Sequence, residues 1–158
     1  VQDETFKNGG GAANFLRFIQ TEVKPYIEQH YRIHNKKQHF FGHSFGGLFG
    51  LYILFHQPNL FQYYTLASPS LWWGKGEFLP KKSDWIAHKP EHILITLGEY
   101  EEKQRIQQRQ QIRPFNAEQL SEKLKSQGNN AHFLWILNKN HGNSIPEAIK
   151  YSVELIQK

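Results

Sequence analysis

The segment QHFFGHSFGGLFG, residues 38–50, decides the fold that we predict for this chain. Residues 42–46 within it fit the pattern G-x-S-x-G, in which a serine stands on a sharp turn between a strand and a helix. An apolar pair precedes the motif, and an apolar stretch at residues 48–55 follows it. This setting predicts a strand, a turn with Ser44 at its tip, and a helix.

Such a turn crowds its surroundings and presents the serine for chemistry. We predict Ser44 as a nucleophile, with Phe45 and His43 as oxyanion-binding or substrate-binding residues. The N–H of Phe45, at the start of the helix, would point at a developing oxyanion, helped by the helix dipole. The alternative is a tight turn whose serine has no chemical role. We expect the room for the turn to come from four glycines, Gly42, Gly46, Gly47 and Gly50.

Length and composition limit the classes of protein that the chain fits. At 158 residues we expect a single domain, residues 1–158, with residues 1–10 as a flexible lead-in. No apolar run approaches the roughly 18 residues of a membrane span, and no signal-peptide pattern opens the chain. The absence of cysteine excludes disulfides and suits cytoplasm and periplasm equally. A start at Val1 without any methionine indicates a processed or apparently truncated chain.

The charge pattern favours a small molecule as the partner. The net charge is +5 and the basic residues are scattered, so most should lie on a solvated surface. A nucleic-acid groove would need a denser basic stripe with interleaved aromatic residues. We therefore expect a small-molecule substrate, which could be anionic, and neither nucleic acid nor a membrane. We expect no cofactor and no metal, because His30 and His34, spaced like zinc ligands, lack the glutamate of a zincin motif.

Alternating apolar patterns predict an α/β fold, a parallel sheet with helices on both faces. Near-continuous apolar runs predict four strands, at residues 38–42, 61–67, 92–97 and 131–137. Helical spacing predicts helices from residue 12 to a kink or end near Lys24, at 45–57, from an Asn116–Gln119 cap to Gly128, and from Pro146 onward. In the last helix we expect Ile149, Val153 and Ile156 to be buried. Residues 71–90 should be irregular, and residues 99–113 an exposed helix or a loop.

The serine needs a base to take its proton and a third group to orient that base. Open α/β sheets place their sites beyond the carboxyl ends of the strands, so these groups should follow the third and fourth strands. His141 follows the fourth strand and is the predicted base, the alternative being a surface histidine. Glu99, Glu101 and Glu102 follow the third strand and are all candidates for the acid, with a solvated carboxylate as the alternative for each.

Trp72 and Trp73 follow the second predicted strand, at the same end of the sheet. Two adjacent tryptophans in a polar loop are costly if they are exposed. They either line a substrate pocket or cover the edge of the core, and the sequence leaves both readings open.

Four segments of the chain resemble one family of α/β-hydrolases. They are GGAANFLRFI at residues 10–19, GHSFGG at 42–47, ASPSLWW at 67–73 and NHG at 140–142. These segments are similar to the esterase D-like family, and especially to its branch of ferric-siderophore esterases, the enterochelin and bacillibactin esterases. The resemblance covers nearly all of this chain but only the C-terminal part of the family's domain.

The resemblance implies Ser44 as the nucleophile, His141 as the base and Glu101 as the acid, although many members have Asp there and Glu99 comes next. It also implies that further N-terminal strands of the family are missing here, and with them a second oxyanion donor. The strand at 38–42 would then be an exposed apolar edge. Such an edge invites pairing with a second copy, as a homodimer, or with a separately supplied N-terminal segment.

Together these features predict a serine hydrolase that cleaves carboxylic esters, with siderophore esters as the substrates that the resemblance suggests. Two alternatives remain. One is a truncated, non-catalytic remnant that keeps the motif, and the other is an acyltransferase that uses the same three residues.

Overall fold

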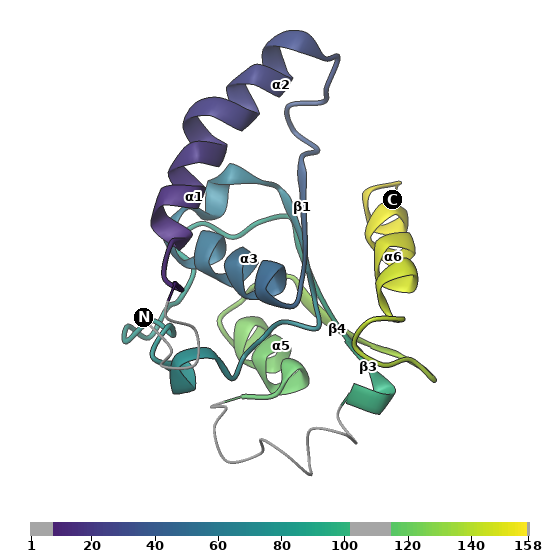
Figure 1. Ribbon diagram of the computed structural model, residues 1–158. Coiled ribbons are helices and arrows are strands. Elements are labelled where there is room, and N and C mark those ends of the chain that lie inside the picture. The colour runs from purple at the N-terminus through teal and green to yellow at the C-terminus, as the bar shows by residue number, and fades with distance from the viewer. Residues whose placement is uncertain (1–7, 102–114, 158) are drawn as a thin grey trace.

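The computed structural model describes residues 8–101 and 115–157, and its centre is a sheet of four strands (Figure 1). All neighbouring strands pair in parallel and lie in sequence order, which confirms the predicted strands and fold class. Most of the predicted lead-in at 1–10 and of the segment at 99–113 lies outside the described residues. The strands are β1 (His39–His43), β2 (Tyr63–Ala67), β3 (His92–Gly98) and β4 (Ala131–Ile136).

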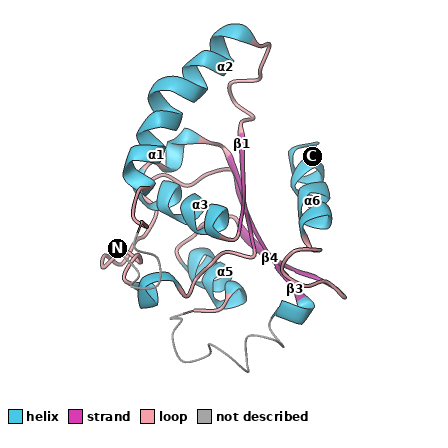
Figure 2. Cartoon of the chain, in the orientation of Figure 1, coloured by secondary structure: helices cyan, strands magenta, loops and turns pink. Residues whose placement is uncertain are grey.

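Helices cover both faces of the sheet (Figure 2). On one face α3 (Phe45–His56) packs on β1 and β2, and α5 (Ala117–Ser126) packs on β3 and β4. On the other face α6 (Ile145–Gln157) packs against β1 and β2. Two short 3-10 turns, η2 (Pro58–Leu60) and η3 (Trp73–Gly76), lie in the connections.

The core lies between α3, α5 and the sheet, where apolar side chains from all three are fully buried. α5 begins with the predicted capping box, in which the Asn116 side chain accepts from the Gln119 N–H at 2.7 Å. Side chains of this core without exposed surface include Leu51, Ile53, Leu54, Leu66, Ile93, Ile95, Leu120 and Leu124.

The first helix continues past Lys24. α1 (Ala12–Phe18) runs through a π-helical turn, η1 (Ile19–Val23), into α2 (Lys24–His30), where Pro25 lies in the first turn. Because the helix is continuous, proline at this position removes one intrahelical N–H and its ring crowds the preceding turn. The disturbance predicted at Pro25 therefore takes the form of a π turn and not of a helix end.

Apolar groups remain uncovered at the outer edge of β1 and along the first helix. Within the described residues β1 pairs only with β2, so its outer edge is open, as predicted. In the first helix Phe15, Tyr26 and Ile27 expose 53%, 56% and 39% of their surface. An open strand edge and exposed aromatic side chains are both features that proteins normally cover.

The buried face of α6 differs from the prediction. Ile149 and Val153 are 45% and 48% exposed, whereas Ala148 and Ser152 are buried. Ile149 and Val153 are four residues apart on one helix face, as are Ala148 and Ser152 on another. The small side chains of Ala148 and Ser152 let the helix lie close to the sheet. The prediction that Ile149 and Val153 are buried is therefore wrong, and Ile156 is only partly buried.

The glycines of the turn differ in what a side chain would meet. A Cβ on Gly42 would lie 2.2 Å from the carbonyl oxygen of Gly46, and one on Gly50 would lie 2.4 Å from Leu66 Cδ2. One on Gly47 would also be tight, 3.0 Å from its nearest neighbour. A Cβ on Gly46 itself would meet nothing within 4 Å, so the prediction that Gly46 supplies room is wrong.

Replacing Gly42 with alanine should destabilise the fold, because the backbone atoms in the way cannot swing aside. We expect the free energy of unfolding to fall by about 2 kcal/mol or more, as in overpacked cores, in urea titrations followed by circular dichroism. Gly46→Ala is the matched control on α3, and it should leave stability unchanged or raise it by up to about 1 kcal/mol. Equal destabilisation by both substitutions would contradict this account of the turn.

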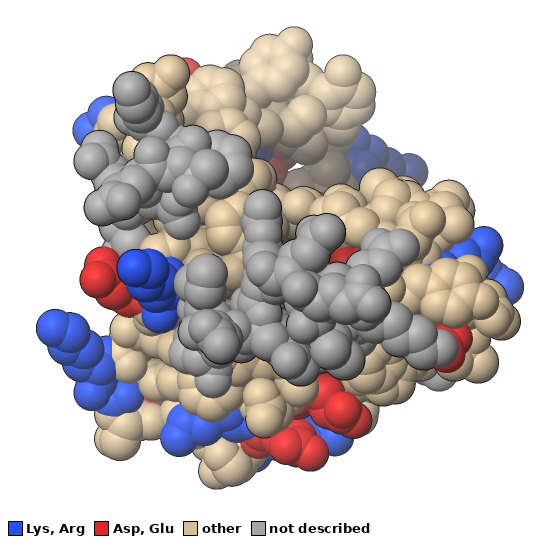
Figure 3. Space-filling model, turned by 60° about the horizontal axis from the view of Figure 1, so that its bottom comes forward, with Lys and Arg blue, Asp and Glu red and all other residues tan. Residues whose placement is uncertain are grey.

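Charged side chains of both signs lie on the face of the molecule in Figure 3. Outside the area drawn in grey, the face in Figure 3 shows blue and red groups dispersed among neutral ones. Within residues 8–101 and 115–157, no helix is long and apolar enough to cross a bilayer.

Candidate active site

The carboxyl ends of the four strands lie at one edge of the sheet, and each is followed by residues of the candidate site. Ser44 follows β1, the segment 68–70 follows β2, Glu101 follows β3, and His141 lies in the loop after β4. Parallel pairing brings these loops together. Ser44 and His141 therefore meet although 97 positions separate them in the sequence.

Ser44 stands on a strained turn, as the motif predicts. Its φ of 59° and ψ of −117° lie where residues other than glycine are rare. Its N–H donates to the Ala67 carbonyl at 2.9 Å, and its own carbonyl accepts from the N–H of Ser70 at 3.1 Å and of Leu48 at 3.0 Å. Bonds to the loop after β2 and to α3 thus hold the turn in place.

Ser44, His141 and Glu101 form a hydrogen-bonded chain. Ser44 Oγ lies 3.0 Å from His141 Nε2, and His141 Nδ1 lies 2.7 Å from Glu101 Oε2. Because a carboxylate only accepts, Nδ1 carries the proton and donates to Glu101. Nε2 then accepts from the Ser44 hydroxyl, the arrangement that activates a serine for attack on a carbonyl.

The Glu101 carboxylate is buried and held by several donors. Its side chain is 1% exposed, and its Oε1 accepts from the Ser68 hydroxyl at 2.5 Å and the Gly98 N–H at 3.0 Å. Burial alone would raise the pKa of this carboxyl, but hydrogen bonds from His141, Ser68 and Gly98 outweigh it and hold the pKa below its usual value. Glu101 is therefore ionised at neutral pH.

The other two candidate acids are placed differently. Glu99 Oε2 accepts from the backbone N–H of Asn138 at 3.0 Å. Glu102 lies outside the described residues. Of the described candidates, the geometry brings Glu101 to His141.

His43 and Phe45 flank Ser44 in different ways. His43 Nε2 donates to the His141 carbonyl at 2.8 Å, and the two rings lie 4.5 Å apart. This contact joins the loop after β4 to the turn, a role that the prediction of His43 as a ligand-binding residue did not include. Phe45 is the first residue of α3, so its N–H lies at the positive end of that helix.

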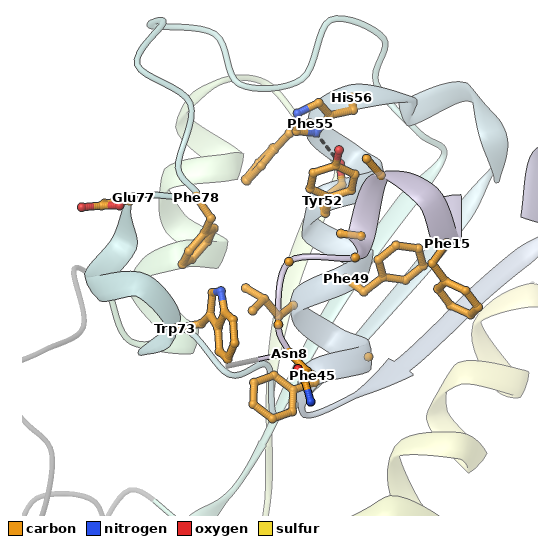
Figure 4. Close-up of a pocket in the computed structure, with 17 residues that line it drawn as sticks. Asn8, Phe15, Phe45, Phe49, Tyr52, Phe55, His56, Trp73, Glu77 and Phe78 are labelled. Atoms are coloured by element: carbon orange, nitrogen blue, oxygen red, sulfur yellow. Dashed lines mark hydrogen bonds between the residues drawn. The ribbon is translucent and has the colours of Figure 1, made fainter. Parts of the chain in front are cut away.

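A pocket of about 1040 Å³ extends along α3 from Phe45, the residue after Ser44, and neither Ser44 nor His141 lines it (Figure 4). Phe45 and Trp73 line it, with their rings edge to face and 5.3 Å apart. The ring of Trp72 packs against that of Phe45, with 5.6 Å between the ring centroids, but Trp72 does not line this pocket. The volume suits a small-molecule ligand. Most of the larger side chains that line the rest of it are aromatic, namely Phe15, Phe49, Tyr52, Phe55, His56 and Phe78.

Sequence reasoning did not assign two serines that the structure places in the site. Ser68 contacts Glu101, and Ser70 Oγ lies 3.3 Å from Ser44 Oγ. The sequence did hold an indication of their importance, because both serines belong to the segment 67–73 that carries the family resemblance. No group of three His, Cys, Asp or Glu side chains in the described parts of the chain could hold a metal ion.

Comparisons of the sequence find a family and several relatives. The family described as "Putative esterase" matches residues 2–133. The chain is 37% identical over 145 residues to the ferri-bacillibactin esterase BesA of Bacillus subtilis, a match that covers 87% of this chain and 48% of BesA. It is 41% identical over 80 residues to the siderophore enterobactin esterase of Emericella nidulans, covering 49% of this chain and 26% of that protein. The chain thus spans about half the length of BesA, and the match to the second relative is shorter still.

Solved structures of similar proteins share the fold. The siderophore hydrolase EstA of Aspergillus nidulans superposes with a TM-score of 0.78 at 28% identity, covering 94% of this chain and 57% of EstA. The BES protein of Bacillus cereus superposes with a TM-score of 0.77 at 31% identity, covering 99% of this chain and 60% of that protein. The four-stranded sheet with its helices is thus part of an α/β-hydrolase fold, and the chain belongs to the "Putative esterase" family.

Proposed function

We propose that this chain carries the catalytic residues of a serine esterase that cleaves carboxylic esters. The observation that carries the proposal is the chain of contacts from Ser44 to His141 to Glu101, at 3.0 and 2.7 Å. The strained backbone of Ser44 adds support, because strain of this kind is found where function requires it.

In the proposed reaction, Ser44 Oγ attacks the ester carbonyl carbon while His141 Nε2 takes the hydroxyl proton. The carbonyl electron pair moves to the oxygen, and the N–H of Phe45 donates to this oxyanion. When the intermediate collapses, the bond to the leaving alkoxide breaks and His141 returns the proton to it. Water then attacks the acyl-serine by the same two steps, which releases the acid and restores Ser44.

Glu101 has the role of orienting the base in this scheme. It keeps the Nδ1 proton of His141 on the side away from Ser44, so Nε2 stays an acceptor. It also stabilises the imidazolium that forms when His141 takes the serine proton. A buried, ionised carboxylate suits both tasks.

Siderophore esters are the substrate class that we propose. Two relatives bear the names ferri-bacillibactin esterase and siderophore enterobactin esterase. The pocket beside Phe45 is lined by aromatic rings, which pack well against flat ring systems. The net charge of +5 is compatible with an anionic substrate.

A fluorophosphonate probe tests the proposed nucleophile. The probe should attach to Ser44, and mass spectrometry of the digested protein should find the adduct on that residue. Ser121→Ala, which removes a buried hydroxyl on α5, should label as the unsubstituted chain does. A chain that stays unmodified would be a non-catalytic remnant, and product analysis with an added alcohol would separate hydrolysis from acyl transfer.

We propose that another strand pairs with the open edge of β1 in the functional protein. The partner would be a second copy, or a segment like the part of the longer relatives that this chain does not span. A chain that remains a well-behaved monomer in size-exclusion chromatography with light scattering would contradict this pairing.

A further inference from the structure

We infer that Ser68 and Ser70 are positioning residues that hold the two ends of the Ser44–His141–Glu101 chain, an inference that rests on the proposed function. The two serines flank Pro69 in the loop after β2. Ser68 is fully buried and Ser70 is 1% exposed. Hydroxyls buried to this degree need hydrogen-bond partners, and both find them within the site.

Backbone hydrogen bonds tie the loop of these serines to the turn of the nucleophile. The N–H of Ser44 donates to the carbonyl of Ala67, and the N–H of Ser70 donates to the carbonyl of Ser44, at 2.9 and 3.1 Å. The N–H of Ser68 donates to the carbonyl of Thr96 in β3 at 2.8 Å. The loop is thus fixed to the two elements that carry the nucleophile and the acid.

Ser68 acts on the acid. Its hydroxyl donates to Glu101 Oε1 at 2.5 Å, and the N–H of Gly98 donates to the same oxygen at 3.0 Å. With Oε1 held by two donors, Oε2 is directed at His141. Ser68 has a φ of 45°, which is costly for any residue but glycine, so the fold retains strain at the position where the hydroxyl is used.

Ser70 acts on the nucleophile. Among the described residues, Ser44 Oγ has two side-chain hydrogen-bond partners, Ser70 Oγ at 3.3 Å and His141 Nε2 at 3.0 Å. When Ser44 donates its proton to His141, the hydroxyl of Ser70 can donate to Ser44. This pair of contacts restricts rotation of the Ser44 side chain and keeps its proton directed at the imidazole.

Single substitutions in the full chain test the inference, with p-nitrophenyl acetate as the substrate. Ser68→Ala and Ser68→Gly should each lower kcat by about tenfold to a hundredfold, the worth of a buried hydrogen bond to a charged group, and leave KM within about twofold. Ser70→Ala removes a neutral hydrogen bond and should lower kcat by about two- to tenfold. The glycine variant separates the hydroxyl from the backbone, because glycine adopts positive φ without strain.

The pH profile distinguishes positioning from loss of structure. The Ser68 hydroxyl is one of the donors that hold the pKa of Glu101 down, so without it the Glu101 carboxyl keeps its proton to higher pH and stops orienting His141. The acid limb of the kcat profile should therefore move to higher pH in both Ser68 variants. Ser121→Ala is the control, because the buried Oγ of Ser121 has no hydrogen-bond partner among the described residues. This substitution should change neither kcat nor the acid limb of the pH profile.

A double substitution asks whether Ser68 works through Glu101. In a Glu101→Gln background, Ser68→Ala should lower kcat by no more than about twofold further. Full additivity of the two losses, or an unchanged kcat and acid limb in both Ser68 variants, would overturn the inference. Activity that survives Ser44→Ala would instead overturn the proposed function, so the two failures can be told apart.

Discussion

Replacing Ser44 with alanine should lower the turnover of p-nitrophenyl esters by about a millionfold, because nucleophile, base and acid act as a unit. Without Oγ, His141 Nε2 loses the hydroxyl that lies 3.0 Å away, and no acyl-enzyme can form. The nearby hydroxyl of Ser70 should not replace it, because among the described contacts it meets Ser44 Oγ and not the imidazole of His141. Steady-state kinetics with highly purified protein measure the loss.

The fold of the Ser44→Ala variant should be intact, so the loss can be assigned to chemistry. Alanine carries the same backbone strain as serine at φ 59°, and the backbone bonds of the turn do not involve the side chain. The thermal unfolding midpoint should stay close to that of the unsubstituted chain, and the fluorophosphonate adduct should disappear. A variant that keeps even a few per cent of the activity would remove Ser44 from the mechanism.

The meeting of Ser44 and His141 could be predicted because a parallel sheet makes the ends of its strands neighbours. Each strand shows as a short apolar run, and the polar residue that follows it must lie at the common edge. The same reasoning placed the candidate acids in the loop after β3. The capping box at Asn116 and Gln119 was equally predictable, because it depends only on residues three apart.

The choice between Glu99 and Glu101 could not be made from local pattern alone. The two residues are two positions apart in the same loop, and their side chains leave it in different directions. What selects Glu101 is the pair of donors from Gly98 and Ser68, and Ser68 comes from another strand end. Only the family resemblance pointed to Glu101 beforehand.

The buried face of α6 and the course of the first helix are two further features that the sequence did not predict fully. Hydrophobicity favoured Ile149 and Val153 for the interior, but the fold buries Ala148 and Ser152, whose small side chains allow close approach. Pro25 indicated a disturbance correctly, yet its form as a π turn depends on how the whole helix accommodates it. Both outcomes depend on tertiary packing, which residue spacing does not encode.

Replacing Glu101 with glutamine should lower kcat by about ten-thousandfold, by placing the proton on the wrong nitrogen of His141. The Oε1 position accepts from Ser68 and Gly98, so the amide oxygen of the glutamine should settle there. The amide nitrogen then faces His141 Nδ1 and can only donate to it. Nδ1 must therefore give up its proton, and the protonated Nε2 can no longer accept from Ser44.

Glu99→Gln is the matched control for this substitution, two residues away in the same loop. Glu99 Oε2 accepts a backbone hydrogen bond from Asn138, which an amide oxygen can also accept. We expect kcat within about threefold of the unsubstituted chain, because the carboxylate that faces His141 Nδ1 is that of Glu101 and the tautomer of His141 is left unchanged. If Glu99→Gln abolished turnover while Glu101→Gln preserved it, Glu99 would be the acid. The tautomer argument predicts the reverse order, because the carboxylate that orients a histidine must face its Nδ1 proton, and Glu101 is the residue that lies 2.7 Å from that nitrogen.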